Sequence, residues 1–288
     1  MIIRQIIKRT LKRFGFELHR INVHGKSNTS SESIQAIPEN QNWSYPFETL
    51  RKKWDVVPTS SSKRQKTERL YNLSDDKLRN EWLKCREDIT TGSEFRHRGW
   101  YHALYSEGMR NKKIMDIGSG FAVDSITFAQ KGARVTFVDI HESNLNVVRR
   151  LCKIFEIEDA QFHLLTSIES LEKLDTNYDF LMAMGSLHHA PVSVIKPEVN
   201  ELIRHLKIGG RWLQLAYPKT RWEREGRPSF YKWGEITDGA GTPWAESYDI
   251  EKLLGLFENA AFEVVLCQEF HNNDFIWFDL LYKGKKTK

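Results

Sequence analysis

The stretch 112–140 shows a regular succession of apolar runs and turns. A short apolar run ends in the turn Gly118-Ser119-Gly120, and a segment with apolar residues at helical spacing follows it. A second apolar run then ends at Asp139. A strand, a glycine turn, a helix and a strand in this order predict the first half of a doubly wound nucleotide-binding sheet.

The later apolar runs extend this pattern. The sequence predicts further strands at 161–165, 178–184, 211–217, 262–270 and 275–282, and helices at 143–155, 196–206 and 250–259. Ser143 is expected to cap its helix. The last two predicted strands are separated by a short turn, so they should pair as a hairpin and reverse the final strand. We therefore predict an α/β protein with a Rossmann-like, doubly wound, seven-stranded sheet, mostly parallel with a C-terminal antiparallel strand, plus a helical N-terminal extension.

The residues around the glycine turn indicate the kind of ligand. Asp139 lies about 20 residues past Gly118, where a carboxylate can bind the hydroxyl pair of a ribose. Val123 stands where a dinucleotide fingerprint requires a small residue, and Asp116 would repel a pyrophosphate. Asp116 would instead suit the ammonium group of an amino acid. A ribose joined to an amino acid indicates S-adenosylmethionine.

Two segments resemble one known family. The pattern D-x-G-x-G-x-A at 116–122 resembles the first motif of class I S-adenosylmethionine-dependent methyltransferases, with Ala122 where glycine is usual. The segments GSLHHAP at 185–191 and LKIGGRWLQL at 206–215 resemble the matching regions of small-molecule methyltransferases, including enzymes of surface-polysaccharide pathways, and the resemblance covers about 113–283. It implies S-adenosylmethionine as cofactor and a set of residues that bind it: Asp116, Gly118, Ser119, Gly120, Asp139, Ile140, Ser167, Ile168 and Gly185.

The sequence departs from the family after the third strand. An acid or an amide is usual there and faces the amine of adenine, but this chain has Thr166 and Ser167. Either the Ser167 hydroxyl or the backbone at Ile168 could take that contact, and the sequence leaves both open.

Methyl transfer to an oxygen needs a base but no metal, and we expect none. His188 and His189 follow the fourth strand, at the sheet edge where ligands bind in open α/β folds. An imidazole there can accept the proton that an alcohol loses during attack. The alternative is that these histidines only pack beneath the cofactor.

Two segments carry candidate substrate residues. The insertion 218–248 follows the fifth strand, which ends at Tyr217, and holds Trp222, Arg224 and Trp244; flat rings beside guanidinium groups suit a sugar. The segment 93–110 includes Arg98 and Tyr101 and could form a lid. In both segments ordinary packing is the alternative. We therefore expect a small-molecule or glycan acceptor.

Other acceptors are ranked by what the chain lacks. No Asn/Asp-Pro-Pro-Tyr/Phe turn follows the fourth predicted strand, and no cysteine lies at the active edge, so DNA methylation is disfavoured. RNA and a lipid or quinone stay open, as does a non-catalytic, cofactor-binding interaction protein. The three cysteines form no metal-ligand or disulfide pattern, which favours a reducing, cytoplasmic setting.

The N-terminal part has a different character. Residues 1–23 predict a basic amphipathic helix that docks either on the inner face of a membrane or on its own domain. Much of the net charge of +5 lies before residue 70 and in the last residues, 283–288. We expect a linker or irregular segment at 24–65, a helical lid or cap at 66–112, and a catalytic domain at 113–284 that includes the insertion 218–248.

Overall fold

The computed structural model of the 288-residue chain describes residues 44–60, 63–92 and 98–286. The chain divides into two units, Met1–Asn42 and Trp43–Lys288. The first unit, with the amphipathic helix predicted at 1–23, lies outside the described residues.

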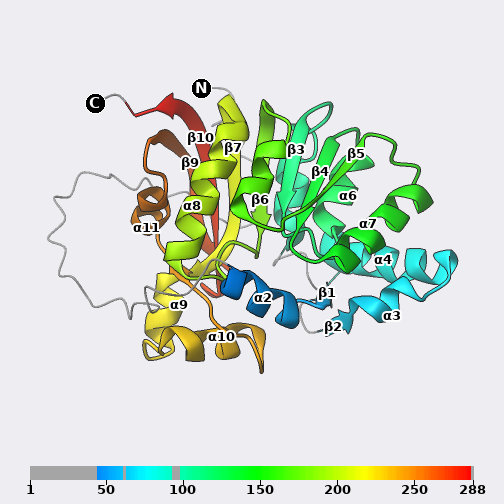
Figure 1. Ribbon diagram of the computed structural model, residues 1–288, viewed down its shortest axis with the longest axis horizontal. Helices are drawn as coiled ribbons and strands as arrows, with labels where there is room; N and C mark the ends of the chain where they lie inside the picture. The colour runs from blue at the N-terminus through cyan, green and yellow to red at the C-terminus, as the bar shows by residue number, and fades with distance from the viewer. Residues whose placement is uncertain (1–43, 61–62, 93–97, 287–288) are drawn as a thin grey trace, which may run out of the picture. The chain divides into compact units, whose positions relative to one another are not determined.

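A twisted sheet forms the centre of the second unit (Figure 1). Its strand order is β5-β4-β3-β6-β7-β10-β9. Six of these seven strands run in one direction, and β10 runs in the opposite direction between β7 and β9. The strands are β3 (Lys113–Ile117), β4 (Arg134–Asp139), β5 (Ala160–Leu164), β6 (Tyr178–Met184), β7 (Leu206–Pro218), β9 (Ala260–Phe270) and β10 (Phe275–Lys285). The predicted doubly wound sheet with a reversed last strand is therefore confirmed. An eighth strand that the sequence did not reveal, β8 (Ser247–Tyr248), pairs with the end of β7.

Helices connect the strands. α6 (Val123–Ala129) and α7 (Glu142–Ile154) pack on β4, while α8 (Val192–Leu202) and the short helix η3 (Ile203–His205) lead from β6 to β7. The short helix η2 (Ile168–Lys173) and α11 (Ile250–Leu256) both contact α8.

Two local predictions about these helices were wrong. Ser143 does not cap α7, which starts at Glu142, because the Asp139 carboxylate accepts a hydrogen bond from the amide of His141 (2.8 Å) and fixes the chain one residue earlier. The helix predicted at 196–206 begins at Val192, directly after Pro191, whose fixed φ suits a helix start.

The segment before the sheet is structured, contrary to the linker or irregular segment expected at 24–65. Within its described part, α2 (Ser44–Lys53) is followed by an antiparallel hairpin of β1 (Val56–Ser60) and β2 (Lys63–Lys66). The cause lies in contacts remote in sequence: Leu50 is buried in the main core, and Arg51 donates to the carbonyl oxygens of Ile140 (3.0 Å) and Leu165 (3.2 Å).

Between 66 and 112, the described residues form the helices α3 (Thr67–Tyr71), α4 (Asp75–Thr90) and α5 (Trp100–Tyr105), while the role of a lid or cap stays a prediction. The insertion after β7 folds into α9 (Lys219–Arg224) and α10 (Phe230–Asp238). In Figure 1, α2, the β1–β2 hairpin and α10 gather below the sheet. No helix among the described residues is both long and apolar enough to span a membrane.

Candidate active site

The glycine turn after β3 is pressed against the loop after β6. Gly118 has φ 73°, and the amides of Gly118 and Ser119 donate to the carbonyl oxygen of Val138 (2.8 and 3.2 Å). A Cβ atom at position 118 would lie 2.4 Å from the Cβ of Ser186, so only glycine fits. Ala122, where the resembling family has glycine, also adopts a positive φ of 51°. The family's preference therefore has a backbone cause, and alanine bears a strain of about 1 kcal/mol here.

Asp139 at the end of β4 organises this turn. Its carboxylate accepts hydrogen bonds from the amides of Gly120 (3.0 Å) and His141 (2.8 Å). The side-chain amide of Asn144 makes two longer contacts with the same carboxylate (3.2 and 3.3 Å). Burial raises the pKa of Asp139, and the two backbone donors oppose that rise. A ribose hydroxyl pair could replace the long contacts to Asn144 and leave the amide contacts in place.

Asp116 on β3 is a buried carboxyl without a cationic partner among the described residues. Its side chain is 4% exposed, and burial raises its pKa to about 7, while the neighbouring Ser125 and Ser119 partly offset the effect. The neighbouring carboxylates of Asp124 and Asp139 raise it further. A bound ammonium group would supply the missing positive charge and return this carboxyl to its ionised form.

A second buried network, which the sequence did not reveal, surrounds Asp124 on α6. Arg98 forms an ion pair with this carboxylate, His102 Nε2 lies 2.5 Å from its Oδ1, and the Tyr101 hydroxyl donates to it (3.2 Å). Burial alone would raise the pKa of Asp124, but Arg98 and His102 hold it below its usual value. The network joins α5 to α6 beside the glycine turn.

A cavity of about 300 Å³ opens at the carboxyl ends of β3, β4 and β6. This volume lies within the range of small-molecule sites. Ten residues singled out from the sequence line it: Arg98, Asp116, Gly118, Ser119, Gly120, Asp139, Ile140, Gly185, His189 and Tyr217. It is closed on its other side by residues that the sequence did not single out, from α2, the β1–β2 hairpin and α10: Leu50, Trp54, Val56, Val57, Arg64, Thr237 and Asp238.

The structure places seven other predicted site residues away from the lining. They are Tyr101, Ser167, Ile168, His188, Trp222, Arg224 and Trp244. Leu165 lines the cavity where Ser167 and Ile168 were expected, because the chain turns into η2 at Ile168. Tyr101 is stacked on Trp277 of β10 at 4.5 Å between ring centroids and belongs to the core.

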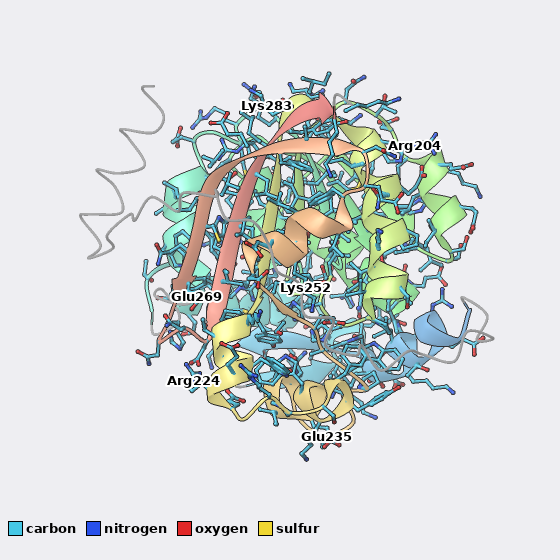
Figure 2. All side chains as sticks on the ribbon, turned by 90° about the vertical axis from the view of Figure 1, so that its left-hand side faces the viewer. Arg204, Arg224, Glu235, Lys252, Glu269 and Lys283 are labelled. Carbon is cyan, nitrogen blue, oxygen red and sulfur yellow. The ribbon has the colours of Figure 1, made fainter. Side chains whose placement is uncertain are left out.

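The three insertion residues have structural partners of their own. The indole of Trp222 donates to the carbonyl oxygen of Pro228 (2.9 Å), and Trp244 is buried with its ring parallel to that of Phe230. Arg224 on α9 is exposed and pairs with Asp274 in the β9–β10 turn (Figure 2). The features that suggested a sugar thus hold the insertion together and do not face the cavity.

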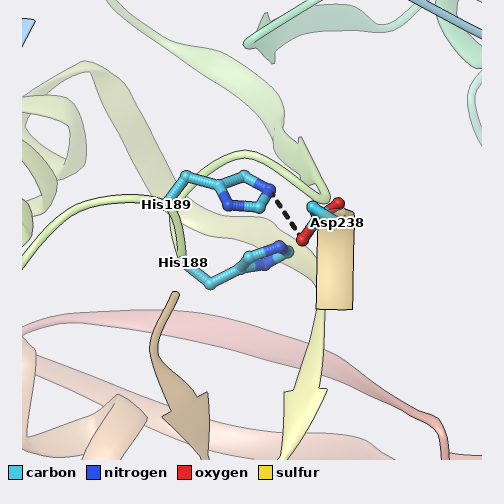
Figure 3. Close-up of side chains that lie close together, drawn as sticks. All are labelled: His188, His189 and Asp238. Atoms are coloured by element: carbon cyan, nitrogen blue, oxygen red, sulfur yellow. Dashed lines mark ion pairs between the residues drawn. The ribbon is translucent and has the colours of Figure 1, made fainter. Parts of the chain in front are cut away.

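His188, His189 and Asp238 lie close together (Figure 3), and the last two line the cavity. His189 Nε2 is 3.7 Å from Asp238 Oδ2, and the two imidazole centroids are 4.1 Å apart. Asp238 is fixed by the Tyr217 hydroxyl, which donates to Oδ2 (2.8 Å), and by Arg64, which pairs with Oδ1 (2.7 Å). Burial lowers the pKa of both histidines, most strongly for His188, so the imidazoles are neutral near pH 7. Of the two, only His189 lines the cavity.

The same three side chains are of metal-ligand type. Their ligand atoms all lie within 4.8 Å of one another. A tetrahedral centre with bonds of about 2.1 Å requires ligand atoms roughly 3.4 Å apart. The Arg64 guanidinium on Asp238 also places a positive charge beside any cation. The arrangement therefore suits an imidazole–carboxylate pair for proton transfer better than a metal centre.

Comparisons with known proteins agree with this geometry. Residues 114–210 match the family model of a methyltransferase domain. The chain is 33% identical over 86 residues to a ubiquinone biosynthesis O-methyltransferase of Aeromonas salmonicida, covering 30% of this chain and 36% of that protein. It is 32% identical over 91 residues to the enzyme of that name from Pseudomonas aeruginosa, covering 31% and 39%. The matches thus span well under two thirds of these relatives.

A solved structure extends the agreement to the fold. A protein of Pyrococcus horikoshii OT3 superposes with a TM-score of 0.53 at 17% identity, covering 71% of this chain and 99% of that one. Residues 114–210 therefore match a methyltransferase domain, and the strand order is the doubly wound one expected from the resemblance to the class I S-adenosylmethionine-dependent methyltransferases. These enzymes take their methyl group from S-adenosylmethionine.

Proposed function

We propose that this protein is an O-methyltransferase that moves a methyl group from S-adenosylmethionine to a hydroxyl group of a small molecule. The observation that carries the proposal is the pairing of a neutral imidazole, His189, with a carboxylate, Asp238, at the wall of the cavity that Asp116 and Asp139 also line. The first pair suits removal of a hydroxyl proton. The second suits the ammonium group and the ribose of the donor.

The donor supplies an activated methyl group, so the protein's own task is alignment and proton removal. In a direct displacement the acceptor oxygen attacks the methyl carbon while its proton passes to His189 Nε2. Asp238 lies 3.7 Å from that nitrogen and stabilises the resulting imidazolium. Tyr217 and Arg64 keep the carboxylate in position. Correct alignment in such a site contributes several kcal/mol, up to roughly 7–11 in favourable systems.

We propose an aromatic hydroxyl as the acceptor. Rings of Trp54, Tyr217 and Phe275 line the cavity around His189. An imidazole whose pKa is lowered is a weak base. A phenol, with a pKa near 10, loses its proton to a weak base more readily than an alkyl alcohol does. The names of the relatives, which are ubiquinone biosynthesis enzymes, favour the same choice.

A sugar hydroxyl is the second candidate. It was favoured by the insertion residues, but Trp222, Arg224 and Trp244 do not line the cavity. Arg64 and Trp54 at the cavity wall still support a sugar. The Arg64 guanidinium lies 4.7 Å from the centroid of the Trp54 ring, and a charged group beside a flat ring is a combination that binds sugars.

Labelled methyl transfer tests the proposal. The purified chain would be incubated with methyl-labelled S-adenosylmethionine and, separately, catechols, saccharides or RNA. We expect label on a catechol or phenol, and a fall in rate of about 10²–10⁴-fold in His189→Ala. His163→Ala, which changes a half-buried histidine outside this cavity, should retain the rate. Label on saccharides alone would favour the second candidate, and label on RNA alone would refute both.

Docking on a membrane surface through residues 1–23 stays a prediction. Its test is co-sedimentation of the full chain with anionic vesicles, in which charge-reversal of the basic residues should abolish binding if the helix docks there.

A further inference from the structure

Five acidic side chains line the cavity, and four of them have a partner in the chain or a proposed ligand. Asp124 is paired with Arg98, Asp139 with backbone amides, and Asp238 with Arg64. Asp116 lies beside Ser119, whose hydroxyl donates to its backbone carbonyl oxygen, and its carboxyl suits the donor's ammonium group. The fifth, Glu198 on α8, receives a hydrogen bond from no described residue.

Glu198 lies at a position where a carboxyl group lowers the stability of the fold. It is 7% exposed, and its pKa is raised to about 7 by burial alone. Ile195 and Leu202, which lie on the same face of α8 three residues before and four residues after it, belong to the main apolar core. A buried carboxyl without a partner costs free energy of folding, and such a group at a cavity wall indicates a contact with a ligand.

The surroundings of Glu198 identify the end of the ligand that it would meet. Its neighbour Ile195 lines the cavity, and its helix α8 packs against η2, which begins directly after Ser167, just beyond the end of β5. Ile140 directly follows Asp139, the candidate ribose ligand, and Leu165 directly follows the end of β5, the next strand along the sheet. This end of the cavity therefore lies beyond the ribose, where the base of the nucleoside belongs.

The usual partners of the base at this end are missing or occupied. The side chains of Thr166 and Ser167, where the resembling family has an acid or an amide, do not line the cavity. The carbonyl oxygens of Ile140, Leu165 and Thr166 accept hydrogen bonds from the Arg51 guanidinium of α2. An adenine amine entering here needs another acceptor.

We propose that Glu198 accepts a hydrogen bond from the exocyclic amine of the donor's adenine and so replaces the absent acid at the end of β5. The inference rests on the proposed function, because it assumes that the cavity binds the methyl donor. A carboxylate only accepts, so it distinguishes a 6-amino purine, which donates, from a 6-oxo purine, which presents another acceptor. Glu198 is thus a base-recognition residue on a helix, outside the glycine-turn motif.

Calorimetry with two product analogues tests this assignment. S-adenosylhomocysteine carries the amine, and S-inosylhomocysteine carries an oxygen in its place. We expect the wild-type chain to bind the adenosyl compound roughly 10–100-fold more tightly, the range of a charge-assisted hydrogen bond. Glu198→Leu should abolish this preference. Glu198→Gln should narrow it, because the amide both accepts from the amine and donates to the oxygen.

Controls separate recognition from folding and from failure of the proposed function. Glu201→Gln alters the same helix outside the cavity lining, where Glu201 pairs with Arg204, and should keep the wild-type preference. Without ligand, the melting temperature of Glu198→Leu should be no lower than that of the wild type, since the variant removes a buried carboxyl. If Glu198→Leu did not fold, the preference of Glu198→Gln between the two compounds would decide the assignment. An unchanged preference in the Glu198 variants, or a change only in acceptor KM, would overturn the assignment. Binding of neither compound by wild type would overturn the proposed function with it.

Discussion

Replacement of Gly118 by alanine offers the sharpest test of the turn that organises the site. The added Cβ atom meets two separate penalties. Position 118 has φ 73°, where a residue with a Cβ atom pays about 1–2 kcal/mol. The new atom would also lie 2.4 Å from the Cβ of Ser186, and overpacking of this kind costs roughly 1–3 kcal/mol. We expect Gly118→Ala to lower the free energy of unfolding by about 2–5 kcal/mol in total.

A second glycine isolates the backbone part of this loss. Gly209 has φ 83°, but an added Cβ atom there would meet nothing within 4 Å. Gly209→Ala should therefore lose only the conformational part, about 1–2 kcal/mol. The difference between the two variants measures the clash with Ser186.

Urea unfolding of four variants would test the reasoning. Removing the Ser186 side chain should relieve the clash, so Gly118→Ala combined with Ser186→Gly should show a favourable coupling of about 1–3 kcal/mol relative to the two single variants. Ser186→Gly alone is needed because it also loses the hydrogen bond from its hydroxyl to the carbonyl oxygen of Ile117. If Gly118→Ala were no less stable than Gly209→Ala, or the coupling were absent, the proposed close approach of the two loops would be refuted.

Three further outcomes follow from the buried charges. Burial raises the pKa of Asp116 from 3.8 to about 7, so between these pH values the folded protein holds a proton on Asp116 that the unfolded chain has lost. The free energy of unfolding of the wild type, measured by urea unfolding relative to Asp116→Asn, should therefore fall as the pH rises from 4 to 7. A difference between the two proteins that stays constant with pH would contradict the raised pKa. Arg98→Met should cost up to about 3–5 kcal/mol because it removes the arginine partner of the buried Asp124 carboxylate and leaves it only His102 and Tyr101. Arg86→Met, at a half-buried site where Arg86 contacts Gln130, should cost little, as thermal unfolding would show. Since burial lowers the pKa of His189, the acid limb of kcat should lie below pH 6.5, and a limb above it would exclude this base.

The part of the site that the sequence predicts is the part built from local geometry. Gly118, Gly120 and Asp139 act through the turn between two adjacent strands, and their spacing in sequence sets their spacing in space. The sheet, with its reversed last strand, follows from apolar runs and one short turn. Such features need no knowledge of distant contacts, and the structure agrees with them.

The other side of the cavity could not be predicted because its contacts are remote in sequence. Arg64 and Asp238 meet across 174 positions, and Arg51 reaches Ile140 across 89. Neither the polar hairpin that carries Arg64 nor the helix that carries Arg51 has a strong periodic pattern. The aromatic and arginine content of the insertion was visible, but composition does not show which way Trp244 points.

Similarity to the relatives gives little information about the acceptor, because the matched segment forms only one part of the cavity wall. The match to the methyltransferase family covers 114–210, which holds the glycine turn, Asp139 and His189. Trp54, Arg64 and Asp238, which close the cavity around His189, all lie outside that segment. Mutations in the β1–β2 hairpin or α10 can therefore reshape the acceptor end of the proposed site while the donor end stays intact. The segment of α2 and Trp54 contacts both ends, because Arg51 donates to the carbonyl oxygen of Ile140 and Trp54 lies against His189. Under the proposed function, the β1–β2 hairpin and α10 are thus the place to seek acceptor specificity.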